Sequence, residues 1–85
     1  MPEISRFLGI VIYIFSDEHN PPHFHAKYGE FTISVEIESG ITKGNFPKKA
    51  LNAVRKWLKI NQKELLEDWK LAAKGEPLKK IKPLE

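Results

Sequence analysis

The sequence contains no cysteine, so its 85 residues form no disulfide and offer no thiolate as a nucleophile or metal ligand. Long apolar runs are also missing, because the longest, residues 7–15, has about 9 residues against the roughly 20 of a membrane-spanning helix. Neither a phosphate-binding glycine loop nor a Gly-x-Ser-x-Gly nucleophile motif occurs. These absences predict a small cytoplasmic protein without a membrane segment or signal peptide.

Charge is distributed unequally along the chain, whose formal net charge is +3. Residues 1–38 carry two basic and six acidic side chains, a net charge of −4, whereas residues 39–85 carry 12 basic and five acidic ones, a net charge of +7. Such asymmetry is typical of proteins that bind nucleic acid or an acidic partner, although a solvated basic helix face has the same composition. The candidate phosphate contacts are Lys27, Lys48, Lys49, Arg55, Lys56 and Lys59.

Three segments of the first half are predicted to be strands. Residues 8–15 are apolar throughout and indicate one strand buried on both faces. Residues 23–28 and 31–38 alternate between apolar and polar, and Gly29-Glu30 between them suits a two-residue hairpin turn. In that register paired residue numbers add to 59, so Phe31, Ile33 and Val35 point inward while His23 lies opposite Glu36 and His25 opposite Ser34.

The second half is predicted to be helical. Apolar residues recur at helical spacing over residues 50–58 and 65–73, and Asn61 followed by Glu64 resembles a capping box between two helices. Pro47 suits the first turn, while Gly75 and Pro77 suit the end. We therefore predict one α+β domain over residues 1–85, with a β-β-β-α-α order. It comprises an antiparallel sheet of three to four strands (about residues 5–43), two C-terminal helices packed on one face (about 47–74) and a basic tail (75–85).

All three histidines of the chain lie within seven residues, at positions 19, 23 and 25, in a segment stiffened by Pro21 and Pro22. One interpretation is proton transfer by His23 or His25 with Glu36 as the orienting carboxylate. A second is a Zn²⁺ site that uses His19, His23 and His25. The third is a solvated sheet face stabilised by cross-strand pairs of roughly 0.2–1 kcal/mol each. The residues alone leave these alternatives open.

The sequence resembles the bacterial domain-of-unknown-function family 4160. The likeness rests on residues 1–7 (MPEISRF), residues 9–12 (GIVI) and residues 19–25 (HNPPHFH). It continues to the C-terminus through Pro47, Leu51, Val54, Trp57, residues 64–66 (ELL), Trp69 and residues 75–77 (GEP). The resemblance implies a small component of a two-gene, toxin–antitoxin-like module with a protein partner encoded nearby, and it adds functional weight to residues 19–25.

From these observations we expect a component of such a module that binds or acts on nucleic acid. One alternative is a protein-interaction module without catalysis that docks the product of the neighbouring gene. The other is a metal-dependent hydrolase that uses the histidines. The sequence does not decide whether the protein is an enzyme, which nucleic acid it prefers, or its oligomeric state.

Overall fold

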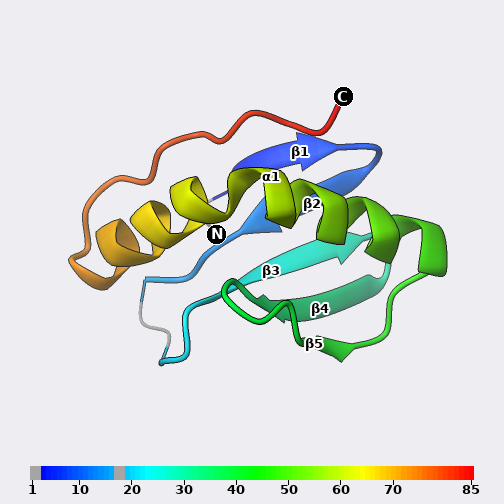
Figure 1. Ribbon diagram of the computed structural model, residues 1–85, viewed down its shortest axis with the longest axis horizontal. Helices are drawn as coiled ribbons and strands as arrows, with labels where there is room; N and C mark the ends of the chain where they lie inside the picture. The colour runs from blue at the N-terminus through cyan, green and yellow to red at the C-terminus, as the bar shows by residue number, and fades with distance from the viewer. Residues whose placement is uncertain (1–2, 17–18) are drawn as a thin grey trace.

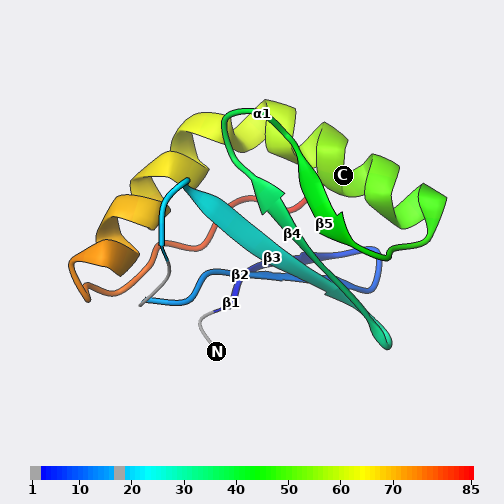
Figure 2. The same cartoon turned by 90° about the horizontal axis from the view of Figure 1, so that it is seen from below.

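The structure, a computed structural model, describes residues 3–16 and 19–85, which form a five-stranded sheet with one helix across a single face (Figures 1 and 2). Every strand pairs antiparallel with its neighbours in sequence, in the order β1-β2-β3-β4-β5. The elements are β1 (Glu3–Phe7), β2 (Ile10–Tyr13), β3 (His23–Tyr28), β4 (Phe31–Glu36), β5 (Thr42–Gly44) and α1 (Lys48–Ala73). The α+β class is therefore confirmed, but the predicted three to four strands and two helices are wrong.

The sheet has more strands than predicted because the apolar run of residues 7–15 contains a turn. Phe7 of β1 lies opposite Ile10 of β2, and Leu8 (φ 51°) and Gly9 (φ 78°) between them both adopt left-handed backbone conformations. Positive φ at both central residues is the geometry of a type I′ hairpin turn. Leucine is not a turn residue, so Gly9 alone signalled this break within an otherwise continuous apolar segment.

The β3–β4 hairpin has the register that the alternation predicted. His23 lies opposite Glu36 and His25 opposite Ser34, while Phe24 and Val35 between them are fully buried. Gly29 in the connecting turn has φ 59°, which glycine adopts at no steric cost. One face of this hairpin therefore joins the core, and the other carries the imidazoles. At the turn Phe31 lies on the same face as Ile33 and Val35, as predicted, but it is 45% exposed and does not join the core.

The two predicted helices are one helix with a kink. Asn61 leaves helical geometry (φ −117°, ψ 21°), but its side-chain amide donates to the carbonyl of Trp57 at 3.0 Å. The chain thus continues through Asn61 with both halves on the same sheet face, instead of starting a new capped helix. At the C-terminus the prediction is confirmed: Gly75 (φ 71°) donates to Ala72, and Glu76 to Leu71, the pattern of a Schellman motif. Among the described residues, no helix combines the length and apolarity that a membrane crossing demands.

The core lies between the inner face of the sheet and the apolar side of α1. Trp57 is fully buried, and its ring centroid lies 5.4 Å from that of Phe7 and 5.7 Å from that of Phe24. Trp69 is also buried, at 8% exposure. Because burial of such rings dominates core energetics, these contacts fix α1 on this face of the sheet. The opposite side of the helix is left to solvent.

The C-terminal tail is held against the sheet and the helix by hydrogen bonds. The Ile81 amide donates to the carbonyl of Ile4 at 2.8 Å, and the Trp57 indole donates to the carbonyl of Lys82 at 2.8 Å. Ile81 is buried, and Leu78 and Leu84 pack against the core. The tail therefore covers part of the β1 edge, which would otherwise present unpaired backbone groups.

Asp68 gives this attachment a pH dependence. Its carboxyl group is buried, Oδ1 accepts the Lys79 amide at 2.9 Å, and within the described residues Oδ2 has no hydrogen-bond partner. Burial raises the pKa of Asp68 above its ordinary value of 3.8, so the folded state holds the proton more tightly than the unfolded state. Stability contributed by this group is therefore lost as the pH rises from the unfolded pKa through the folded one.

Asp68→Asn removes this titration while retaining an oxygen acceptor for Lys79. We expect the difference in free energy of unfolding between variant and wild type to shift in favour of the variant as the pH rises above 3.8, the ordinary pKa of the carboxyl group. Urea denaturation at a series of pH values measures both curves. If the curves of unfolding free energy against pH were parallel for the two proteins, the Asp68 carboxyl group would have the same pKa in the folded and unfolded states, which would contradict this prediction.

Candidate functional site

Two groups of side chains on opposite sides of the molecule are candidates for function. The first is the exposed side of α1 and the second is a hollow on the outer face of the sheet, which faces away from α1. Residues that line this hollow come from β3, β4, β5, the loop between β4 and β5 and the segment before β3, and none comes from α1. The predicted nucleic-acid contacts of α1 and the predicted histidines therefore belong to different surfaces.

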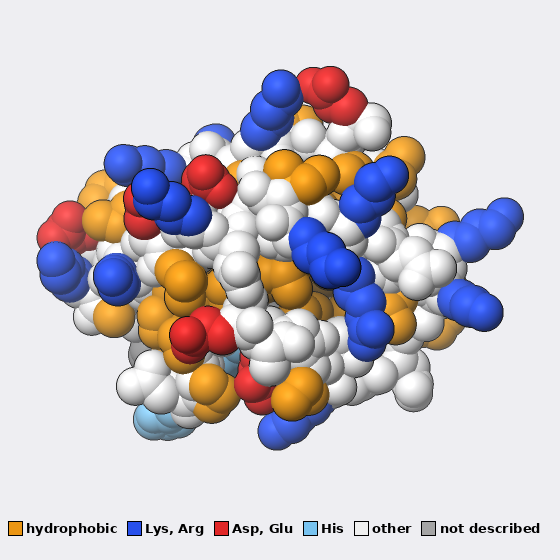
Figure 3. All heavy atoms as spheres, viewed as in Figure 1, with side chains coloured by type: hydrophobic (Ala, Val, Ile, Leu, Met, Phe, Trp, Pro, Cys, Tyr) orange, Lys and Arg blue, Asp and Glu red, His pale blue; other side chains and the backbone are white. Residues whose placement is uncertain are grey.

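The exposed side of α1 forms a basic face. Between Lys48 and Lys63 the helix carries six cations and no carboxylate, and all six cationic side chains are exposed. They lie opposite the buried residues because apolar and basic positions repeat with the same helical period. In Figure 3 these side chains run along the solvent side of the helix. The members of the basic face are Lys48, Lys49, Arg55, Lys56, Lys59 and Lys63.

The start of the basic face is electrostatically unfavourable for the helix itself. Lys48 and Lys49 occupy the first turn, where there is no acidic residue, and the preceding Pro47 makes no side-chain capping hydrogen bond. The amino end of a helix carries a partial positive charge, so each cation there costs about 0.3–1 kcal/mol. Two lysines at this position lower the stability of the helix, but they suit the binding of an anionic ligand.

Lys27, the remaining predicted phosphate contact, lies elsewhere. It is an exposed residue of β3 and pairs with Val11 and Thr32. Its neighbour Ala26 is fully buried on the core face, so Lys27 projects from the outer face of the sheet.

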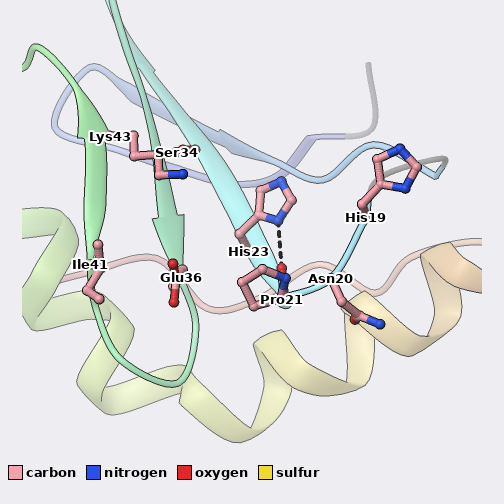
Figure 4. A pocket seen from close by; sticks show the side chains of 8 residues that line it. All are labelled: His19, Asn20, Pro21, His23, Ser34, Glu36, Ile41 and Lys43. Atoms are coloured by element: carbon pink, nitrogen blue, oxygen red, sulfur yellow. Dashed lines mark hydrogen bonds between the residues drawn. The ribbon is translucent and has the colours of Figure 1, made fainter.

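The hollow on the outer face has a volume of about 230 Å³ (Figure 4). Its lining combines imidazole, amide, hydroxyl, carboxylate and ammonium groups, which could bind a small polar molecule. The residues are His19, Asn20, Pro21, His23, Ser34, Glu36, Ile41 and Lys43. His25 is not among them, although its ring contacts that of His23.

His23 is oriented by a backbone group that the sequence analysis did not identify. Its Nδ1 lies 2.8 Å from the carbonyl oxygen of Pro21, which can only accept a hydrogen bond. In the neutral ring Nδ1 must therefore carry the proton and Nε2 the lone pair. The ring also contacts Trp69 and His25, at centroid distances of 5.1 and 5.2 Å. His23 thus touches the helix at the margin of the sheet and is half-buried.

Glu36 makes a contact other than the one expected for an orienting carboxylate. Its Oε1 accepts the Ser39 hydroxyl at 2.9 Å, and Ser39 Oγ accepts the amide of Ile41 at 3.2 Å. These bonds order the loop between β4 and β5. In Figure 4 the Glu36 carboxylate and the His23 ring point in different directions. The carboxylate therefore contributes to loop structure.

His25 belongs to an aromatic cluster rather than to the hollow. Its ring stacks on Tyr13 with a centroid distance of 5.4 Å and an interplanar angle of 15°. Phe15 contacts it edge-on at 5.1 Å. The sequence analysis missed this cluster because Tyr13 and Phe15 were assigned to a strand buried on both faces.

The predicted zinc ligands are not assembled in this structure. In the described ranges, 3–16 and 19–85, no three His, Cys, Asp or Glu side chains are grouped closely enough to hold a metal ion. His19 is exposed in the segment before β3, and only His23 and His25 share a strand.

Comparison with known proteins gives a family but no activity. A family model described as "Domain of unknown function (DUF4160)" matches residues 9–70, which is well over half of the chain. The match includes the histidine segment and most of α1, and it excludes β1 and the C-terminal tail. No curated protein and no solved structure matches the sequence.

Proposed function

Since the chain belongs to the DUF4160 family, whose description assigns no activity, we propose from its surface chemistry that it binds nucleic acid through the basic face of α1. In this proposal it serves as the nucleic-acid-binding component of a two-gene, toxin–antitoxin-like module. The phosphate backbone is the ligand of the basic face, and the contacts are independent of base sequence.

The six clustered cations are the observation that carries the proposal. Neutralisation of phosphates by Lys and Arg releases condensed counterions, which provides most of the affinity in non-specific binding. The basic face extends over 16 residues of helix, and this part of the helix contains no carboxylate. Only Arg55 among its members offers a planar fork for bidentate contacts, so phosphate contacts predominate over base recognition.

The basic face supports a function more strongly than the hollow does. Acid–base chemistry in the hollow would rely on His23, but the Glu36 carboxylate predicted to orient it accepts a hydrogen bond from Ser39. The hollow also has cationic and anionic members, Lys43 and Glu36, that offset each other. The exposed side of α1 between Lys48 and Lys63 has one sign of charge throughout.

Replacement of three central cations tests the proposal. We expect Arg55→Gln/Lys56→Gln/Lys59→Gln to weaken binding to all sequences alike, because glutamine preserves helix propensity and removes only charge. The plot of log K against log salt should become shallower by about 0.9 for each phosphate that the variant no longer neutralises on duplex DNA, and by about 0.7 on a single strand. Fluorescence anisotropy with labelled RNA and DNA at several salt concentrations measures both quantities.

A matched control removes three exposed lysines outside α1, in the variant Lys27→Gln/Lys43→Gln/Lys82→Gln. The net charge changes equally, so a general charge effect would weaken both variants to the same extent. Equal losses, or an absence of salt-dependent binding by the wild type, would contradict the proposed function.

A further inference from the structure

Two aromatic rings are exposed at the end of the sheet where α1 begins. Tyr28 and Phe31 form the pair that closes the β3–β4 hairpin, and they are 38% and 45% exposed. Their row continues from Ile10 of β2, which is 1% exposed. Of these cross-strand neighbours, Ile10 is therefore buried in the core, whereas Tyr28 and Phe31 are exposed to solvent because α1 covers only part of the sheet. Because the two rings are neighbours, they form a contiguous apolar patch of the kind that marks an interaction site.

A groove of about 440 Å³ joins this end of the sheet to the basic face. It is lined by Tyr28 of β3 and by Lys48 and Lys49 of the first turn of α1, together with Pro47, Ala50 and Ala53. Phe46 supports the Tyr28 ring with an edge-on contact at a centroid distance of 6.1 Å. One aromatic residue and two lysines therefore line the same groove.

Leu8 contributes an apolar side chain to the groove, although its backbone conformation is energetically unfavourable. It is 70% exposed and lines the groove, although it occupies a left-handed position that costs a leucine about 1–2 kcal/mol. Asparagine would satisfy a type I′ turn at this position and be soluble. A leucine held here is better explained by contact with an apolar ligand surface than by the stability of the turn.

We infer that the groove receives unpaired bases, so that the protein binds single-stranded in preference to double-stranded nucleic acid; this inference rests on the proposed function. A base has an apolar face that stacks on an aromatic ring and is joined to an anionic phosphate. The bases of a duplex present only their edges, whereas those of a single strand can present their faces to Tyr28 in the groove and to its strand partner Phe31 beside it. Aromatic platforms beside a basic track are the combination that binds single strands without sequence preference.

The two tryptophans do not provide this platform. Trp57 is fully buried and Trp69 is 8% exposed, so both belong to the core. Among the described residues, Tyr28 and Phe31 are the exposed aromatic side chains. Stacking therefore occurs at the amino end of the basic face, where Lys48 and Lys49 bind the adjacent phosphates.

The test compares oligothymidylate and oligouridylate of about 15 nucleotides with a duplex of equal length by fluorescence anisotropy. We expect the wild type to bind both single strands more tightly than the duplex. Tyr28→Leu/Phe31→Leu should weaken single-strand binding by about 10- to 100-fold, since stacking contributes about 1–3 kcal/mol per base. Duplex affinity and the salt dependence should stay unchanged, because no cation is removed.

Two further variants separate stacking from structure. Tyr28→Phe retains a ring and should keep the wild-type affinity, whereas Ile41→Ala removes a 56% exposed apolar side chain elsewhere and should have no effect. Circular dichroism checks that each variant is folded. Tighter binding to the duplex, or a folded leucine variant with wild-type affinity for single strands, would overturn the inference and leave the proposed function standing. An absence of binding to every probe would overturn both.

Discussion

Lys48→Glu/Lys49→Glu is expected to stabilise the fold and to remove most of its affinity for nucleic acid. Both side chains are exposed in the first turn of α1, where carboxylates are favoured over cations by the helix dipole. We expect an increase of about 1–2 kcal/mol in the free energy of unfolding and a rise in Tm of about 5–10 °C. Thermal and urea denaturation measure both changes.

The same substitution acts in the opposite direction on binding. A unit charge about 4 Å from a phosphate contributes about 1 kcal/mol in water, so two charge reversals cost about 4 kcal/mol before screening by salt. Screening reduces this value, and we expect a loss of about 100-fold in affinity at about 50 mM salt. Opposite effects on stability and binding would identify the two lysines as ligand contacts that the fold accommodates at a cost.

Lys27→Glu/Lys43→Glu is the control for this experiment, because it makes the same change in net charge on the outer face of the sheet. It should alter neither the helix nor contacts made by α1. If this control lost as much affinity as the helix variant, binding would not be specific to the basic face of α1, and the proposal would be contradicted. A helix variant that is less stable than the wild type would contradict the dipole argument.

Trp57→Ala is expected to cause the largest loss of stability in the molecule. Trp57 is fully buried, its ring contacts Phe7 and Phe24, and its indole donates to the Lys82 carbonyl at 2.8 Å. Removal of such a side chain costs about 3–5 kcal/mol, a large part of the roughly 5–15 kcal/mol that stabilises a domain. In a domain of this size Tm should fall by about 15–30 °C.

Trp57→Phe separates the ring from its hydrogen bond. Phenylalanine keeps most of the apolar contact but leaves the Lys82 carbonyl without the indole donor, for which we expect a cost of about 1–3 kcal/mol. Hydrogen exchange should increase in the tail around Ile81. Urea denaturation followed by the fluorescence of Trp69 reports on both variants. A cost below about 1 kcal/mol for the alanine variant would show that this contact does not hold α1 on the sheet.

The local sequence was sufficient to predict those structural features whose geometry is set by residues close together in the chain. Alternation on both sides of Gly29-Glu30 determined the register of β3 and β4, because a shift of one residue would move every apolar side chain to solvent. Gly75 determined the end of α1, since its φ of 71° suits residues without a side chain. Helical periodicity likewise predicted that the cations from Lys48 to Lys63 share a face opposite the core.

Tertiary structure decided the features that depend on distant contacts. The helix continues through Asn61 because both of its halves pack on one sheet, and the turn at Leu8-Gly9 was hidden in an apolar run that reads as one strand. Glu36 hydrogen-bonds to Ser39 although its strand partner is His23, since side-chain rotamers and loop geometry are not encoded in spacing. Tyr28 and Phe31 are exposed although their pattern is that of core residues, because the extent of sheet that a helix covers depends on where the helix starts and how it crosses. That physical relationship exists only in the folded chain.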